Sequence, residues 1–348
     1  WSGTTGFVEC LLADHYDLDS IAQVCADAGI RAALGALVMD VDPVTRDAMG
    51  WPVEMWQTRQ SGIDNALAGH ARWSGGDSGV QVWFGCRSVE EAQDLSVFRE
   101  VGELARANEM GITIHLAELP IDNEFARSQG HRSAIALAQD LGLLGPRTVL
   151  AHCTVADDED VAVLAETGTT VSHCPANNSS AGWGPAPLAE MLAAGVNVTL
   201  GCDGAPSNTN MDLLRDLRIA AHVARVRAQS RLALSPETIL EMATRNGAHA
   251  LGMGDRLGSL EPGKLADFIV IDTDAAHLQP IWSPAATVVF GAQGSDVDTV
   301  VIGGREIVRG REVLTMDAEA IVADVRRRRP VVAERAGVTG IVPLWPVS

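Results

Sequence analysis

Ile112-Thr-Ile-His-Leu-Ala-Glu118 is a short apolar segment that finishes on two polar side chains, a histidine and a glutamate. The same arrangement recurs three times downstream, where apolar segments end in Ala151-His-Cys153, Ser172-His-Cys-Pro175 and Gly201-Cys-Asp-Gly204. Segments with the spacing of helices lie between these strand ends. A repeated strand–helix unit brings the carboxyl ends of its strands to one face of a parallel sheet. We therefore expect the polar groups of all four segments to lie close together.

Seven short segments have the composition of β-strands, because they are rich in Val, Ile, Leu and Thr and are bounded by Gly, Pro or Asp. They are residues 6–10, 31–39, 80–85, 112–116, 148–152, 170–173 and 197–201. Helical spacing of apolar residues occurs in 18–28, 89–108, 132–143, 157–167, 187–194, 211–227 and 236–243, while 119–131 is irregular. This alternation predicts an α/β fold, a (β/α)8 TIM-type barrel that lacks one strand. A doubly wound open sheet is the alternative, but no Gly-x-Gly-x-x-Gly follows the first strand.

The pattern changes near Gly258, where the chain becomes rich in strand signals. A turn leads into a hydrophobic strand that ends near residue 272, and 287–290 and 299–309 are predicted strands, the last with a turn at Gly303-Gly304. We therefore expect a barrel over 1–257, a β-sandwich segment over 258–316, and a C-terminal helix and tail over 317–348.

Composition and charge exclude two classes of partner. The 348-residue chain is 47% hydrophobic and carries a formal net charge of −19, which argues against binding to nucleic-acid phosphates or anionic lipid. The basic run Arg326-Arg-Arg-Arg329 lies in the predicted tail helix and is interpreted as a solvated helix face. No run approaches the roughly 20 apolar residues of a membrane span. We expect a cytoplasmic homodimer that binds a small molecule.

The six cysteines do not indicate a disulfide framework, because they are spread along the chain without a C-x-x-C spacing. Cys153, Cys174 and Cys202 each neighbour one of the polar strand-end residues. Neighbouring strand residues point to opposite faces, so we expect these thiols to pack against helices as small apolar groups.

The strand-end residues are suited to metal binding and proton transfer. His115 is a natural ligand for Zn²⁺ or Fe²⁺, and Glu118 can accept and return a proton. The Asp203 carboxylate can bind metal with one oxygen and hold water with the other. Each residue also has a structural interpretation: Asp203 as a turn or cap residue, and His152 and His173 as hydrogen-bonded structural histidines. Their joint occurrence at successive strand ends favours function, although a catalytic zinc usually takes three protein ligands and two are evident.

Several longer motifs extend this pattern along nearly the whole chain, from Ser2-Gly-Thr-Thr5 to Leu314-Thr-Met-Asp317. They include His115-Leu-Ala-Glu118, Val171-Ser-His-Cys-Pro-Ala-Asn-Asn178, Leu200-Gly-Cys-Asp-Gly-Ala-Pro-Ser-Asn208, Gly258-Ser-Leu-Glu-Pro-Gly-Lys-Leu-Ala-Asp267 and Gly294-Ser-Asp-Val-Asp-Thr-Val300. These segments resemble the amidohydrolase superfamily, in its chlorohydrolase and aminohydrolase branch. That branch includes methylthioadenosine/S-adenosylhomocysteine deaminases, guanine-type deaminases and triazine hydrolases.

The resemblance implies a barrel with one divalent metal ion, zinc or alternatively iron, and a composite β-sandwich made from both chain ends. His115 and Asp203 would be metal ligands, with Asp203 also orienting the attacking water as a base. Glu118 would carry a proton to the substrate ring, and His152 would polarise the water or hold the intermediate. The substrate pocket would be lined by His173, Asn178, Trp183 and Ser207.

The chain departs from this family in one respect. The family's His-x-His pair lies on the first barrel strand, upstream of the Ser-Gly-Thr-Thr motif, and no His-x-His occurs in this sequence. The chain opens at Trp1 without an initiator Met, which is typical of an interior piece. The two explanations are an N-terminally truncated piece of a normal enzyme, inactive by itself, and a protein that lacks the first strand. We expect the first, because a barrel without that strand has two unpaired edges.

The expected activity is hydrolytic deamination of an aminated heterocycle, such as a purine, a pterin or a nucleoside-like ring. A triazine-type dechlorinating or N-dealkylating hydrolase would use the same residues and is the alternative enzyme. A non-catalytic ligand-binding homologue is the alternative from another class. Trp51, Trp56 and Trp73 are candidates to stack on a flat ring, and packing is the other interpretation of each.

Overall fold

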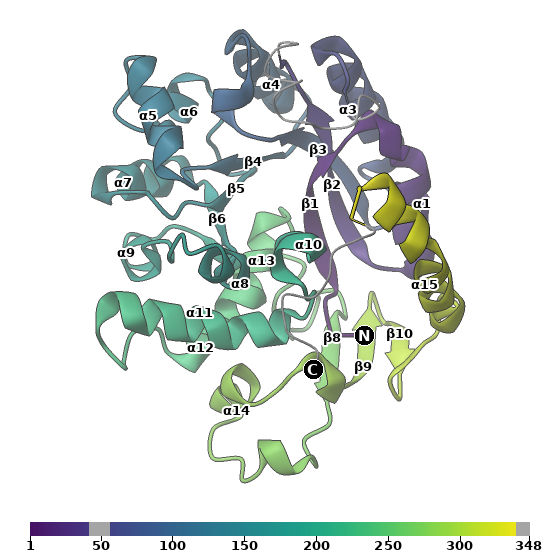
Figure 1. Ribbon diagram of the computed structural model, residues 1–348. Helices are drawn as coiled ribbons and strands as arrows, with labels where there is room; N and C mark the ends of the chain where they lie inside the picture. The colour runs from purple at the N-terminus through teal and green to yellow at the C-terminus, as the bar shows by residue number, and fades with distance from the viewer. Residues whose placement is uncertain (42–55, 339–348) are drawn as a thin grey trace, which may run out of the picture.

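Seven parallel strands form a single curled sheet in the computed structural model, which describes residues 1–41 and 56–338 (Figure 1). The strands follow one another in sequence order, and the described residues contain no pairing between β1 and β7. Their bounds are β1 Gly6–Leu12, β2 Arg31–Val38, β3 Val80–Cys86, β4 Ile112–Leu116, β5 Thr148–His152, β6 Thr170–His173 and β7 Val198–Leu200. The predicted barrel class is confirmed, with the described sheet forming an open barrel.

Glycines on β2 and β3 allow the sheet to curl tightly. A Cβ atom on Gly85 would lie 2.3 Å from the Cys10 carbonyl oxygen of β1, and one on Gly35 would lie 2.6 Å from the Glu9 carbonyl oxygen. The curl brings β1 to β4, which is not its neighbour in the sheet, since Cys10 Sγ lies 3.0 Å from Thr113 Oγ1. The strand ends are therefore gathered around one centre rather than spread along a flat edge.

Helices cover the outside of this sheet (Figure 1). The principal ones are α1 Leu18–Ala28, α3 Arg59–Trp73, α4 Ser96–Ala107, α5 Pro120–Ser128, α6 Ala134–Asp140, α7 Asp158–Thr167, α8 Pro175–Ser180, α9 Leu188–Ala193, α10 Ala205–Asn208, α11 Leu213–Ala228, α12 Pro236–Ala243 and α13 Arg245–Ala250. The main core lies between strands and helices and includes Phe84, Ile114 and Leu150. Burial of this apolar surface is the main force that holds the two layers together.

One helix prediction is wrong in part, and one segment predicted to be irregular is helical. The predicted helix over 89–108 is divided into the 3₁₀ turn η3 Val89–Glu91 and α4, because Asp94 accepts hydrogen bonds from the backbone and hydroxyl of Ser96 and starts a new helix there. The segment 119–131, predicted to be irregular, contains α5. Pro120 at the first helical position and Asp122 in the first turn begin this helix.

A small antiparallel sheet follows the barrel, with strand order β11-β10-β9-β8. Its strands are β8 Phe268–Ile271, β9 Val297–Ile302, β10 Arg305–Arg309 and β11 Glu312–Val313. The predicted strand over 287–290 is wrong, because these residues belong to helix α14 Pro284–Phe290. Ser283 accepts a hydrogen bond from the Ala286 N–H and Pro284 occupies the first turn, and together they override the strand preference of Thr and Val.

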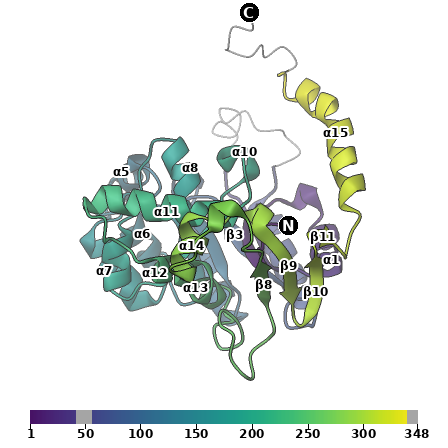
Figure 2. The same ribbon diagram turned by 90° about the horizontal axis from the view of Figure 1, so that it is seen from below.

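The last helix, α15 Ala318–Arg335, follows the small sheet and extends to the outside of the molecule (Figure 2). It has no buried residues, and the arginine run lies on it in solvent. In the described parts of the chain, no helix is both long enough and apolar enough to cross a membrane.

A buried ion pair joins the barrel to the small sheet. Arg31 at the start of β2 donates two hydrogen bonds to Asp267, of 2.7 and 2.8 Å, and the two side chains are 13% and 6% exposed. Gly303 N–H also donates to Asp267 at 2.7 Å. A paired arrangement of this kind fixes the geometry between two layers more than it adds stability.

Replacing Arg31 with Met should lower the free energy of unfolding by about 3 kcal/mol, because it leaves the Asp267 carboxylate buried without its cation. Urea denaturation measures this change. The exposed pair of Arg72 and Asp19, with side chains 56% and 45% exposed, provides the control. Arg72→Met should cost less than about 1 kcal/mol, and equal losses in the two variants would contradict the prediction.

Candidate metal and acid–base site

The predicted strand-end residues converge at the carboxyl end of the sheet. His115 is the last but one residue of β4, His152 and His173 end β5 and β6, and Asp203 follows β7. The imidazole rings of His115 and His152 are stacked, with centroids 5.3 Å apart. Glu118 Oε1 lies 3.5 Å from His152 Nε2, and the Asp203 carboxylate is close enough to act electrostatically on both His115 and Glu118. The structure therefore brings together the four residues predicted to hold metal and move protons.

The backbone at these strand ends is strained. Ala117, His152, Cys153 and Asp203 have φ angles of 50°, 74°, 52° and 61°, in the left-handed region that non-glycine residues rarely adopt. Each such residue costs on the order of 1–3 kcal/mol, and such strain clusters at functional sites. The left-handed residues lie at the ends of β4, β5 and β7, and they include His152 and Asp203 of the sequence pattern.

Glu118 is positioned by the start of α5. Asp122 Oδ2 accepts a hydrogen bond of 2.7 Å from the Glu118 N–H, and the Thr154 hydroxyl donates to the Glu118 carbonyl oxygen. Burial raises the pKa of the Glu118 carboxyl, and the carboxylates of Asp122 and Asp203 add to the rise while His152 opposes it. A carboxyl with a raised pKa is suited to accept and return a proton.

His152 is held between two side chains. Its Nδ1 lies 2.9 Å from Asn178 Oδ1 on α8, its Nε2 faces Glu118, and the side chain is 1% exposed. Trp183 contacts the ring edge-on, with centroids 6.2 Å apart. Asn178 Oδ1 is thus occupied by the histidine, whereas its Nδ2 is buried and has no hydrogen-bond partner among the described residues. Asn178 and Trp183 both lie beside His152, on the side of α8.

His173 is fully buried, and neither ring nitrogen has a hydrogen-bond partner in the described structure. Burial, with a smaller effect of His152, lowers the pKa of His173 to about 3, so its imidazole is neutral. A buried imidazole without a partner is costly unless a ligand pairs with it. The arrangement suits a residue that contacts a bound molecule.

Two residues offer donors that fit part of a metal site. His115 Nδ1 is buried with no partner among the described residues, and burial together with His152 lowers the pKa of this histidine to about 4, so the ring is neutral and one of its nitrogens has a free lone pair. Asp203 Oδ1 accepts a 2.6 Å hydrogen bond from the Gly204 N–H. In 1–41 and 56–338, no group of three or more His, Cys, Asp or Glu residues is arranged to hold a metal ion. One nitrogen and one carboxylate suit zinc, and a complete catalytic site takes at least one further ligand.

The remaining predicted residues are Ser207 and the tryptophans that are candidates for ring stacking. Ser207 is exposed on α10. Trp73 packs against the core and donates its indole N–H to Asp19 at 2.7 Å, and Trp56 packs against the cluster that contains Leu37. Trp51 lies outside the described residues. The structure thus favours packing over ring stacking for Trp56 and Trp73.

The cysteines beside the strand ends differ in environment. Cys153 and Cys174 are buried as predicted, and burial raises the pKa of both thiols, which therefore remain neutral. Cys202 is half-buried near the Asp216 carboxylate of α11, and burial together with this carboxylate raises the pKa of its thiol. The prediction of simple apolar packing is therefore wrong for Cys202.

Three residues that support the site were not among the predicted ones: Asp122, Asn208 and Asp216. Asp122 follows Pro120 at the spacing of a helix first turn, and this capping signal could have revealed it. Asn208 at the end of α10 and Asp216 on α11 pair across eight residues, at 3.0 Å. No local sequence pattern predicts the contact between Asn208 and Asp216.

The ionisation of Asp216 should make the stability of the protein depend on pH. Burial raises the pKa of this carboxyl to about 6 from its usual 3.8. Because the folded-state pKa lies above the unfolded-state pKa, the folded state is favoured while this carboxyl holds its proton. That contribution to stability is lost as the pH rises through 6. The stability of Asp216→Asn relative to wild type should therefore increase by about 1 kcal/mol between about pH 5 and about pH 7.5. Urea denaturation at both pH values measures it, and a pH-independent difference would contradict it.

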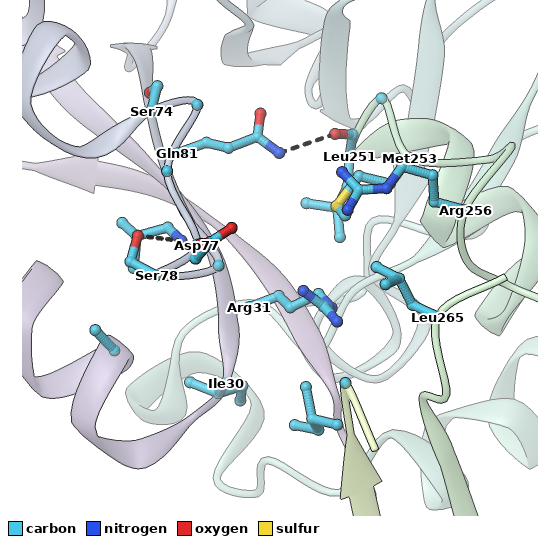
Figure 3. Close-up of a pocket in the computed structure, with 18 of the residues that line it drawn as sticks. Ile30, Arg31, Ser74, Asp77, Ser78, Gln81, Leu251, Met253, Arg256 and Leu265 are labelled. Carbon is cyan, nitrogen blue, oxygen red and sulfur yellow. Dashed lines mark hydrogen bonds between the residues drawn. The ribbon is translucent and has the colours of Figure 1, made fainter. Parts of the chain in front are cut away.

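A cavity of about 740 Å³ lies at the opposite end of the sheet, around the starts of β2 and β3 (Figure 3). Arg31, Gln81, Leu251 and Arg256 are among its lining residues, and Gln81 donates a hydrogen bond to the Leu251 carbonyl oxygen at 3.2 Å. None of the predicted site residues lines it. Because parallel α/β barrels carry their chemistry at the carboxyl ends of the strands, we place the site at the His115 cluster rather than in this cavity.

Known proteins share both the sequence and the fold of this chain. The model of the Amidohydrolase family matches residues 2–307. The 5-methylthioadenosine/S-adenosylhomocysteine deaminase of Pyrococcus abyssi is 34% identical over 331 residues, which cover 92% of this chain and 71% of that protein. The 5'-deoxyadenosine deaminase of Methanothermobacter thermautotrophicus is 33% identical over 322 residues, with 92% and 71% covered.

Two solved structures extend the comparison. An adenosine deaminase from Xanthomonas campestris with bound zinc has a TM-score of 0.87 and 29% identity, covering 96% of this chain and 72% of that one. An atrazine chlorohydrolase from Arthrobacter aurescens, complexed with zinc, has a TM-score of 0.82 and 26% identity, covering 92% and 71%. These zinc-bound relatives support a divalent metal. The predicted resemblance is confirmed: the chain belongs to the amidohydrolase family.

Proposed function

We propose that the chain carries most of the active site of an enzyme that deaminates the adenine ring of a nucleoside with a modified 5' position. Membership of the amidohydrolase family and the deaminase relatives support hydrolysis of a C–N bond in an aminated heterocycle. The observation that carries the proposal is the cluster in which Glu118 faces His152 at 3.5 Å, beside the stacked ring of His115. It combines metal donors with a proton-transfer pair.

The side chains divide the chemistry among them. We assign His115 and Asp203 as metal ligands, and Asp203 also as the base that removes a proton from the attacking water. Glu118 passes a proton to a ring nitrogen of the substrate, and its raised pKa keeps it ready to hold that proton. His152, fixed by Asn178, donates to or orients the oxygen that attacks the ring carbon. His173 and the free Nδ2 of Asn178 face the substrate.

Zinc is the proposed metal, because relatives are solved with zinc and the donor set is one imidazole nitrogen and one carboxylate oxygen. When bound, such an ion makes hydroxide available near neutral pH by lowering the pKa of water. Iron is the alternative, since imidazole and carboxylate also bind it. Metal analysis of purified protein decides between them.

A substrate panel tests the reaction. The full-length protein is loaded with zinc and assayed for ammonia release from 5'-methylthioadenosine, S-adenosylhomocysteine, 5'-deoxyadenosine, guanine and an aminated pterin. The proposal expects the highest kcat/KM among the three adenine nucleosides. No ammonia from any of them would overturn it.

A triazine hydrolase is the second candidate, favoured by the likeness to atrazine chlorohydrolase. The same residues would serve it, so the leaving group must be measured. Chloride or alkylamine release from triazines, without ammonia from nucleosides, would support this candidate. A non-catalytic binding protein would show no bound metal and no turnover on either panel.

A further inference from the structure

The loop that carries Asp203 is held in place by the side chain of Asn208. The Asn208 Nδ2 group donates two hydrogen bonds, one of 2.8 Å to the Cys202 carbonyl oxygen and one of 3.0 Å to Asp216 Oδ2. Both protons of a single amide nitrogen are therefore engaged. Asn208 ends α10, so its hydrogen bond to the Cys202 carbonyl oxygen spans the segment between β7 and the end of α10.

The first of these hydrogen bonds acts directly on Asp203. The Cys202 carbonyl belongs to the peptide bond that precedes Asp203, and the orientation of that peptide sets the φ angle of Asp203, which is 61°. On the other side, the Gly204 N–H donates to Asp203 Oδ1 at 2.6 Å. Asp203 is thus held from both sides in a backbone conformation that it would otherwise rarely adopt.

Asp216 connects this loop to the body of the protein. It lies in the first turn of α11, is 0% exposed, and accepts a hydrogen bond from Asn208 through its Oδ2. The helix itself is anchored by Leu214 and Leu217, which are buried in the core. Asp216 therefore ties the short loop that carries Asp203 to a helix packed in the core.

The arrangement is poor for stability alone. Asp216 Oδ1 is buried and has no hydrogen-bond partner among the described residues. A buried carboxylate with an unpaired oxygen costs folding free energy, and an apolar residue would fill the same place without that cost. The buried carboxylate of Asp216 is therefore better explained by the Asn208 side chain that it holds than by a gain in folding stability.

We propose that Asn208 and Asp216 are positioning residues for Asp203, which orient its carboxylate for metal binding and for removal of the water proton. The inference rests on the proposed function, because it requires Asp203 to be a ligand and a base. Outer residues of this kind typically change metal affinity or activity by about 10–100-fold when they are removed.

The test compares zinc affinity and steady-state kinetics in the full-length protein. Asn208→Ala and Asp216→Ala should each weaken zinc binding, measured by competition with a chelator, by about 10–100-fold. With saturating zinc, kcat for ammonia release should fall while KM stays within about twofold of wild type, because the substrate contacts are intact. Asp216→Asn keeps an oxygen that accepts from Asn208 and should restore most of the zinc affinity lost in Asp216→Ala.

Asp296→Ala is the matched control. Asp296 is also a buried carboxylate, 3% exposed, that accepts hydrogen bonds from His277 and from the Gln293 N–H, but it lies next to the small sheet. This variant should lose stability without a change in zinc affinity or kcat. Asn208 is half-buried, so Asn208→Ala carries the test if Asp216→Ala does not fold.

The inference and the proposed function fail in different ways. Wild-type zinc affinity and kcat in Asn208→Ala and Asp216→Ala, together with loss of both in Asp203→Ala, would overturn the positioning role alone. Equal zinc loss in Asp296→Ala would also overturn it, because the effect would then be general destabilisation. A wild-type protein that neither binds zinc nor releases ammonia would overturn the proposed function.

Discussion

Replacing Glu118 with Gln should lower kcat for ammonia release by about 10²–10⁴-fold while leaving the zinc content of the protein unchanged. The amide has nearly the shape of the carboxyl but cannot carry a proton. Glu118 is half-buried beside His152, and burial raises the pKa of its carboxyl, which is the property a proton carrier needs. Its backbone is held by Asp122, so the substitution should leave the strand end in place.

The measurement pairs turnover with metal analysis of the same full-length protein. Glu124→Gln is the matched control, because Glu124 lies on the same short helix, α5, with its side chain exposed to solvent. This control should keep wild-type turnover. Loss of zinc in Glu118→Gln would contradict the assignment and make Glu118 a metal ligand or a structural residue.

The convergence of the site could be predicted because it follows from topology. Once 112–116, 148–152 and 170–173 are taken as successive parallel strands, their carboxyl ends must meet, whatever the helices between them do. The strand register agrees, since Leu116 pairs with His152 and His173 with Leu200. Residue spacing along the chain was sufficient for this part of the architecture.

What the sequence could not reveal is how the side chains pair. Asn178 and Trp183 were predicted as substrate contacts, and in the structure both touch His152. The pairing of Asn208 with Asp216 depends on the relative position of α10 and α11, which no periodicity encodes. Local capping also outweighed strand propensity at α14, where Ser283 and Pro284 start a helix through Thr and Val residues.

Replacing His115 with Ala should remove the metal as well as the activity. The His115 Nδ1 atom is buried without a partner among the described residues, and the low pKa of this histidine, about 4, keeps the ring neutral, with one nitrogen free to bind a cation. Zinc affinity should fall by at least about 100-fold, since a direct ligand matters more than the outer residues that orient it. The added zinc should raise the melting temperature of wild type but not of the variant, because binding to the native state stabilises it.

His131→Ala is the control for this variant. His131 is 27% exposed and lies 3.9 Å from Asp140, away from the strand ends, so its loss should leave zinc binding and turnover unchanged. Comparison with Glu118→Gln then separates the two roles, because both variants should lose turnover and only His115→Ala should lose zinc. Full zinc binding by His115→Ala would show that the metal is held by other residues, and the stacked pair of His115 and His152 would have to be reassigned to substrate binding.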